Sequence, residues 1–136
     1  MEATELIISD WVIGKKWREK PFQIIRINDN GKFIYGKRTD SIVGPFLIDG
    51  LEPILLTLEI LERNNFELRD GFLYHRIDDK PHHYDFKLKN GGVFSSEGYT
   101  LECGIYLLTI RYVHELQHAL RLCGLHELAD NFKVEE

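Results

Sequence analysis

Cysteines and long apolar runs are scarce in this sequence, and each scarcity excludes a class of protein. Only 2 cysteines, Cys103 and Cys123, occur in 136 residues, which is too few for a disulfide framework and is typical of reduced, buried thiols. No apolar run approaches the roughly 20 residues that a membrane-spanning helix requires. The first residues, Met1-Glu-Ala-Thr-Glu5, lack the basic start and apolar core of a signal peptide. We therefore expect a cytoplasmic protein that does not enter a membrane.

Clustered basic residues are also scarce. The net charge is −5, with 8 basic against 7 acidic residues in positions 1–50 and 9 against 15 in positions 51–136. Binding to nucleic acid generally needs clustered Lys and Arg, so this charge disfavours nucleic acid as a partner without excluding it. One basic cluster stands out, comprising Lys15, Lys16, Trp17, Arg18 and Lys20. A tryptophan among cations is a common composition for a contact patch, for protein or for nucleic acid, and a solvated loop with the indole folded back is the simpler alternative.

Most catalytic signatures are missing: there is no Gly-rich phosphate loop, no nucleophile elbow and no Cys-x-x-Cys pair. The exception is His114-Glu-Leu-Gln-His118, which has the HExxH spacing of zinc peptidases. In those enzymes two histidines at i and i+4 bind zinc, and the glutamate acts as general base.

The order of β-rich and helical segments predicts an α+β protein. Residues 6–13, 22–27 and 32–35, with a hairpin turn at 28–31 and further strands near 41–48, resemble a small SH3-like β-barrel unit. A linking helix follows, in which Thr57 is the expected N-cap and Leu58, Ile60 and Leu61 point inward. Strands near 66–110 then form an antiparallel meander, packed by a helix over 112–124, and the tail from 125 is expected to fray. These segments predict two units, 1–50 and 51–136, or one continuous domain.

Helical periodicity assigns the faces of the last helix. At about 100° per residue, one arc carries the apolar side chains Tyr112, Val113, Leu116, Ala119, Leu120 and Cys123. The opposite side carries His114, Gln117, His118 and Arg121, so these side chains are expected to be exposed. Replacing Gln117 with Ala should therefore cost under about 0.5 kcal/mol.

A zinc site in this helix would require a third ligand. The metzincin extension is absent, because Arg121 and Gly124 occupy the two positions that it needs. The remaining ligand candidates lie at spacings that match no zinc peptidase: His126, Glu127, Asp130, His75, His82 and His83. Arg121 also places a cation beside the proposed dication. We therefore expect no cofactor, with zinc held by His114 and His118 and with Glu115 as base kept as the alternative.

Three segments of the chain resemble a family of small uncharacterised proteins of Bacteroidetes and their prophages or mobile elements. The segments are Ile8-Ser-Asp-Trp-Val12, Pro53-Ile-Leu-Leu-Thr-Leu-Glu-Ile-Leu61 and Tyr112-Val-His-Glu-Leu-Gln117, the last matching a Y-V-H-x-L-Q pattern. Neither the glutamate nor the second histidine of the HExxH string belongs to that pattern. The resemblance implies no established activity. It favours a non-enzymatic interaction or accessory module with a protein partner, and the alternative is a small zinc-dependent hydrolase of the HExxH metallopeptidase type.

Overall fold

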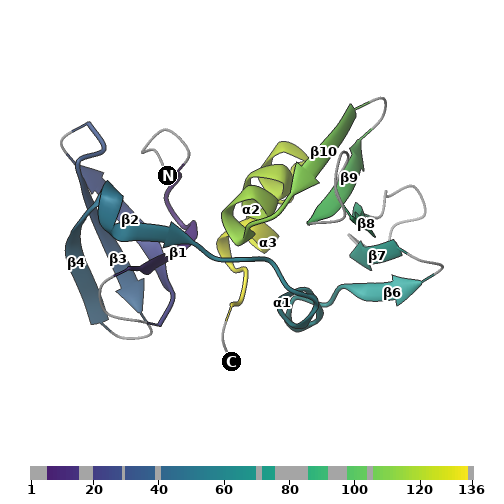
Figure 1. Cartoon of the computed structure of the whole chain (residues 1–136), viewed down its shortest axis with the longest axis horizontal. Helices are drawn as coiled ribbons and strands as arrows, with labels where there is room; N and C mark the ends of the chain where they lie inside the picture. Colours follow the sequence, from purple (N-terminus) through teal and green to yellow (C-terminus); the bar gives the residue numbers. More distant parts are fainter. Residues whose placement is uncertain are drawn as a thin grey trace.

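The computed structural model describes residues 6–15, 20–28, 30–38, 41–69, 72–75, 86–91, 98–103 and 106–134. Within them the chain forms two five-stranded antiparallel sheets, one from each half of the sequence. The helices lie between the two sheets along the long axis of the molecule (Figure 1). The predicted α+β class is confirmed. None of the described helices is long and apolar enough to cross a membrane.

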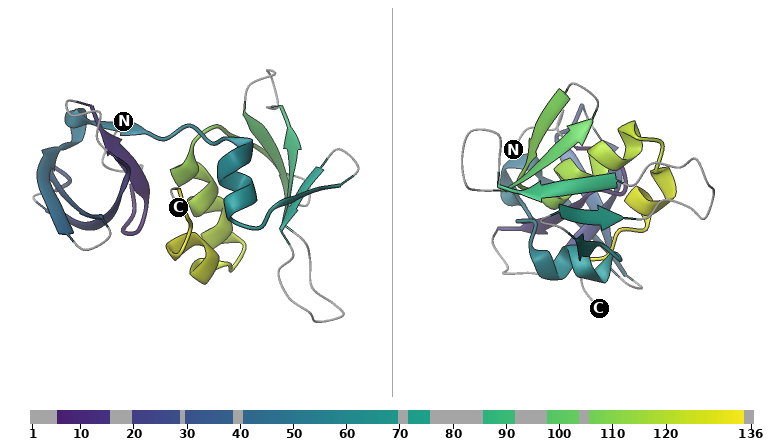
Figure 2. Two further views of the ribbon diagram at one scale, coloured as in Figure 1. Left: turned by 90° about the horizontal axis from the view of Figure 1, so that it is seen from below. Right: turned by 90° about the vertical axis from the view of Figure 1, so that its right-hand side faces the viewer.

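The first sheet has the strand order β4-β3-β2-β1-β5. Its elements are β1 (Trp11–Gly14), β2 (Phe22–Asn28), β3 (Phe33–Arg38), β4 (Ser41–Leu47), the 3₁₀ turn η2 (Ile48–Gly50) and β5 (Leu51–Pro53). The hairpin predicted at 28–31 is confirmed, because the Gly31 N–H donates to the Asn28 carbonyl at 3.2 Å. The sheet is strongly curved (Figure 2), but β4 and β5 remain unpaired edges, so its described strands do not close into the expected barrel.

Alternating side chains of the first sheet form a small core of its own. The buried members are Leu6, Val12, Phe22, Ile24, Ile34 and Leu51. The Phe22 ring stacks on Phe46 with centroids 4.9 Å apart and lies directly over Gly36. A Cβ on Gly36 would come within 2.0 Å of that ring, so only glycine fits there. The predicted strand over 6–13 begins later than expected, because residues 8 and 9 form a turn in which Ser9 has φ 78°.

The linking helix α1 (Leu58–Arg63) begins as predicted. The Thr57 hydroxyl accepts a hydrogen bond from the Ile60 N–H at 3.3 Å, which satisfies one of the unpaired amides of the first turn. Ile60 and Leu61 are buried, as expected, but Leu58 is 44% exposed. The inward orientation predicted for Leu58 is therefore wrong, although its neighbours Ile60 and Leu61 in the same turn are packed.

The second sheet is the predicted meander, with strand order β10-β9-β8-β7-β6. Its strands are β6 (Glu67–Arg69), β7 (Phe72–His75), β8 (Phe86–Asn90), β9 (Tyr99–Cys103) and β10 (Tyr106–Ile110). β10 leads directly into α2 (Val113–Leu122), and α3 (His126–Asp130) follows. The larger core lies between this sheet and the helices, and its fully buried members include Leu61, Leu88, Leu116 and Leu120.

The C-terminal segment is ordered further than the sequence suggests. Phe132 is 1% exposed and Val134 is 5% exposed, and both belong to the larger core. The Asn64 side chain holds the segment through two hydrogen bonds of 2.7 Å to the backbone of Lys133, one donated and one accepted. The expectation of a frayed tail is therefore wrong for the residues up to 134.

Candidate functional site

Helix α2 is buried on two sides rather than one. The predicted apolar positions Val113, Leu116, Ala119 and Leu120 are buried, which confirms that face. Gln117 is also 0% exposed and His114 only 4% exposed, so the prediction that the opposite face is solvated is wrong. The reason is tertiary: the second sheet packs on one side of α2, and the strand-β1 end of the first sheet packs on the other (Figure 2).

The end of α2 corrects a second expectation. Cys123 is exposed, although the helical wheel places it on the core face. The helix ends at Leu122, and Cys123 is its C-cap, one residue before Gly124 with φ 81°. It therefore lies past the last packed turn, and the prediction of a buried thiol is wrong for this cysteine. The side chain of Cys103 lies outside the described part of the structure.

Glu115, the general base of the zinc alternative, has a structural role at the helix N-terminus. Its carboxylate accepts hydrogen bonds of 3.0 Å from the backbone N–H groups of Arg111 and Tyr112. This is the glutamate half of a capping box, in which an N3 side chain satisfies the amide of the N-cap residue. The negative charge also complements the positive end of the helix dipole. Both bonds go to Oε1, so one oxygen of this carboxylate is committed to the cap.

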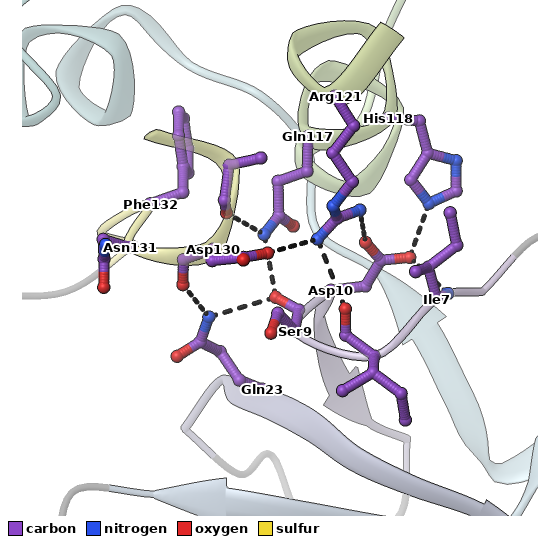
Figure 3. Close-up of polar contacts among 12 residues, drawn as sticks. Ile7, Ser9, Asp10, Gln23, Gln117, His118, Arg121, Asp130, Asn131 and Phe132 are labelled. Atoms are coloured by element: carbon purple, nitrogen blue, oxygen red, sulfur yellow. Dashed lines mark hydrogen bonds and ion pairs between the residues drawn. The ribbon is translucent and has the colours of Figure 1, made fainter. Parts of the chain in front are cut away.

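His118 contacts a carboxylate that is distant in sequence. Its Nε2 atom lies 2.6 Å from Oδ2 of Asp10, which is 108 residues away. The other oxygen of Asp10 accepts a hydrogen bond of 2.9 Å from Arg121, and the Ile7 N–H donates to Oδ2 at 2.8 Å. Asp10 is 0% exposed, so this charge is stable only because it is paired and hydrogen-bonded (Figure 3).

Gln117 makes three hydrogen bonds that join α2 to the chain around β1 and to α3. Its amide oxygen accepts from the Trp11 N–H at 3.0 Å, and its amide nitrogen donates to the carbonyls of Ser9 at 2.8 Å and Ala129 at 2.9 Å. Gln23 of β2 reinforces the same place, because its amide donates to Ser9 and to the Asp130 carbonyl (Figure 3). We call these contacts, with those of Asp10, the inter-sheet junction.

The described residues contain no group of three or more His, Cys, Asp or Glu side chains placed to hold a metal ion. The His114 ring stacks on Tyr112 with ring centroids 6.0 Å apart. The His118 ring meets the His114 ring edge-on, with centroids 5.6 Å apart. Of the sequence-predicted third ligands, Asp130 lies 3.5 Å from Arg121, while His126 and Glu127 are exposed on α3. His75 ends β7, its side chain undescribed, and His82 and His83 lie outside the described residues.

The basic cluster lies between β1 and β2. Lys15 and Lys20 flank it, and both are exposed, whereas Lys16, Trp17 and Arg18 lie outside the described residues. The backbone at its two ends is anchored. The Lys15 N–H donates to the Gly50 carbonyl at 2.8 Å, and Arg38 donates to the Lys20 carbonyl at 2.9 Å.

A cavity of about 430 Å³ lies at the N-terminal end of α2, where the linker between the two sheets passes the start of the helix. It is lined by Leu55, Leu56, Asn90, Gly98, Tyr99, Arg111 and Tyr112. Backbone bonds close this corner, from the Leu56 N–H to the Arg111 carbonyl at 2.9 Å and from the Val113 N–H to Ile54 at 2.8 Å. Burial raises the pKa of the Tyr99 hydroxyl above its usual value, so that this group stays neutral.

Sequence reasoning missed Asp10, the bridging role of Gln117 and the cavity beside Arg111. A signal existed for Asp10, since a carboxylate inside the apolar run of residues 6–13 must find a partner if that run is buried. No local pattern indicates the other two, because their partners come from distant segments.

Comparison with known proteins gives no assignment: no family model matches the chain, and neither a curated protein nor a solved structure matches it significantly.

Proposed function

We propose that this protein is a non-enzymatic interaction module, an accessory protein of a prophage or mobile element that binds a protein partner. The observation that supports this most directly is the use made of the HExxH residues. Glu115 caps α2, and His118 contacts the buried carboxylate of Asp10, so two of the three catalytic positions take part in folding. A helix whose polar side chains make such structural contacts acts as a scaffold between the two sheets.

The family resemblance supports the same proposal, because its three segments meet in space. Ser9 and Trp11 of the first segment bond to Gln117 of the third through their backbone. Ile54 of the second segment accepts a hydrogen bond from Val113 of the third. The pattern Y-V-H-x-L-Q thus includes the glutamine that joins the sheets and omits Glu115, which is consistent with a structural motif rather than a catalytic one.

The first sheet is the proposed binding unit. Its order β4-β3-β2-β1-β5, with a 3₁₀ turn before the last strand, supports an SH3-like arrangement whose closure is incomplete. The contact loop would be the basic cluster of Lys15, Lys16, Trp17, Arg18 and Lys20, carried between β1 and β2. Its exposed flanking lysines are consistent with a partner that is acidic at the contact.

The test replaces Lys15, Lys16 and Arg18 with Ala and compares capture of the partner by crosslinking and mass spectrometry. A matched control replaces three exposed lysines elsewhere, Lys32, Lys89 and Lys133, and so removes the same charge. We expect the loop variant alone to lose its crosslinked partner, with its melting temperature unchanged. Retained capture by the loop variant, or a complex insensitive to about 0.5 M salt, would contradict the proposal, since exposed charges are screened within roughly 10 Å at about 0.1 M salt.

One observation favours the alternative of a small zinc-dependent hydrolase: the Asp10 carboxylate lies beside the second histidine of the HExxH string. Arg121 already neutralises that carboxylate at 2.9 Å, which weakens it as a metal ligand. The test measures the metal content of untagged protein after dialysis. Stoichiometric zinc, lost in His118→Ala, would show a zinc site at this string and make the hydrolase the favoured function. We expect a metal content well below one per chain.

A further inference from the structure

We propose that the cavity beside Arg111 binds a small organic carboxylate with an apolar body about the size of an aromatic ring. This site is separate from the proposed contact loop and does not depend on the proposed function. Its volume of about 430 Å³ lies within the range of small-molecule sites, roughly 300–1,000 Å³.

The backbone that carries the cation of this site is held in place before any ligand arrives. The Arg111 N–H donates to Glu115 at 3.0 Å, and its carbonyl accepts from the Leu56 N–H at 2.9 Å. The side-chain stem passes over Gly98, where an added Cβ would lie 3.0 Å from Cγ of Arg111. Gly98 also has φ +80°, a conformation that other residues adopt only with strain. An anchored backbone reduces the ordering that binding requires, which favours affinity.

The polar groups around this cation are not used within the protein. In the part of the chain that the structure describes, the Arg111 guanidinium forms no ion pair. The hydroxyl of Tyr99 likewise has no hydrogen-bond partner among the described residues. A guanidinium and two phenols around one cavity supply donors for an oxyanion.

The remaining walls indicate the rest of the ligand. Leu55 is 62% exposed although it lines the cavity, whereas Leu56, which also lines the cavity, is buried. Two tyrosine rings and two leucines favour a flat or branched apolar group.

The charge around the cavity favours a single negative charge on the ligand. Arg111 is the one charged residue among those that line the described cavity, and the carboxylate of Glu115 lies within 3.0 Å of its backbone nitrogen. A dianion such as a phosphate monoester would face one cation and this nearby carboxylate. A carboxylate is therefore favoured over a phosphate.

The experiment titrates the full chain with 3-phenylpropionate and follows amide shifts by NMR. Parallel titrations use phenyl phosphate and the neutral 3-phenylpropanamide. A fourth titration uses a tripeptide with a free C-terminal Phe, to distinguish a free organic acid from the carboxylate of a peptide chain. We expect shifts at residues 98–99 and 111–112 with 3-phenylpropionate, binding at least 10-fold weaker for the amide, and weaker binding for the phosphate and the tripeptide.

Two variants locate the site. Arg111→Gln should weaken 3-phenylpropionate binding at least 10-fold, while Lys89→Gln, which removes an exposed cation outside the cavity, should leave it unchanged. Both should keep the wild-type melting temperature. Equal binding of acid and amide, equal loss in both variants, shifts elsewhere in the chain, tighter binding of phosphate, or no saturable binding up to about 10 mM would each overturn the proposal.

Discussion

Replacing Gln117 tests whether the inter-sheet junction holds the two halves of the molecule together. The side chain is 0% exposed and makes three hydrogen bonds, all to backbone groups. In Gln117→Ala the Trp11 N–H loses this partner, whereas the Ala129 carbonyl still accepts from the Phe132 N–H at 3.4 Å. The Ser9 carbonyl is affected less, because Gln23 still donates to it at 3.0 Å.

The expected cost follows from this one abandoned amide. A buried polar group left without a partner costs about 1–3 kcal/mol, before the small cavity is added. Domains of this size are stable by about 5–15 kcal/mol, so the variant should be clearly destabilised. The helical wheel predicts under about 0.5 kcal/mol for the same change, so the two lines of reasoning are clearly separated.

Urea unfolding followed by tryptophan fluorescence measures the free energy of unfolding. Trp11 is a suitable reporter because its indole donates to the Phe132 carbonyl at 2.6 Å across the same junction. Gln117→Met keeps the volume and removes the bonds, which isolates the polar contribution. Leu122→Ala, at a side chain 83% exposed on the same helix, should change stability by under about 0.5 kcal/mol. A loss of less than about 1 kcal/mol in Gln117→Ala, with an unchanged m-value, would refute the reasoning.

Three further predictions concern the cap, the buried charge and the first sheet. Glu115→Ala should lower the free energy of unfolding by about 0.5–2 kcal/mol through loss of the helix cap, and Glu115→Gln should restore most of it in the same urea assay. Asp10→Ala should cost about 3–5 kcal/mol, measured by thermal and urea unfolding, because its arginine partner keeps a largely buried charge; a cost under about 1 kcal/mol would mean that the pair does not stabilise the fold. Gly36→Ala should cost about 1–3 kcal/mol or more, because its Cβ would overlap the Phe22 ring, whereas Gly50→Ala, with nothing within 4 Å, should be nearly neutral by calorimetry.

Local patterns in the sequence were sufficient to predict most of the secondary structure. The Thr57 cap, the turn before Gly31 and the core-facing Leu116 and Leu120 all depend on neighbours within a few residues, so their physical causes are visible in the chain itself. The same holds for the antiparallel meander of the second half, where consecutive strands pair in order.

The burial of Gln117 and His114 was decided only by tertiary structure. A helical wheel shows which face of α2 is apolar, but it assumes that only that face is covered. The first sheet covers the other face as well, through polar contacts to Ser9, Asp10 and Trp11 that span more than 100 residues. Hydrogen bonds to backbone allow a polar face to be buried without an apolar pattern. The role expected for His118 changes from exposed side chain to partner of a buried carboxylate for the same reason. Its partner Asp10 is 108 residues away, and only the fold brings the two side chains together.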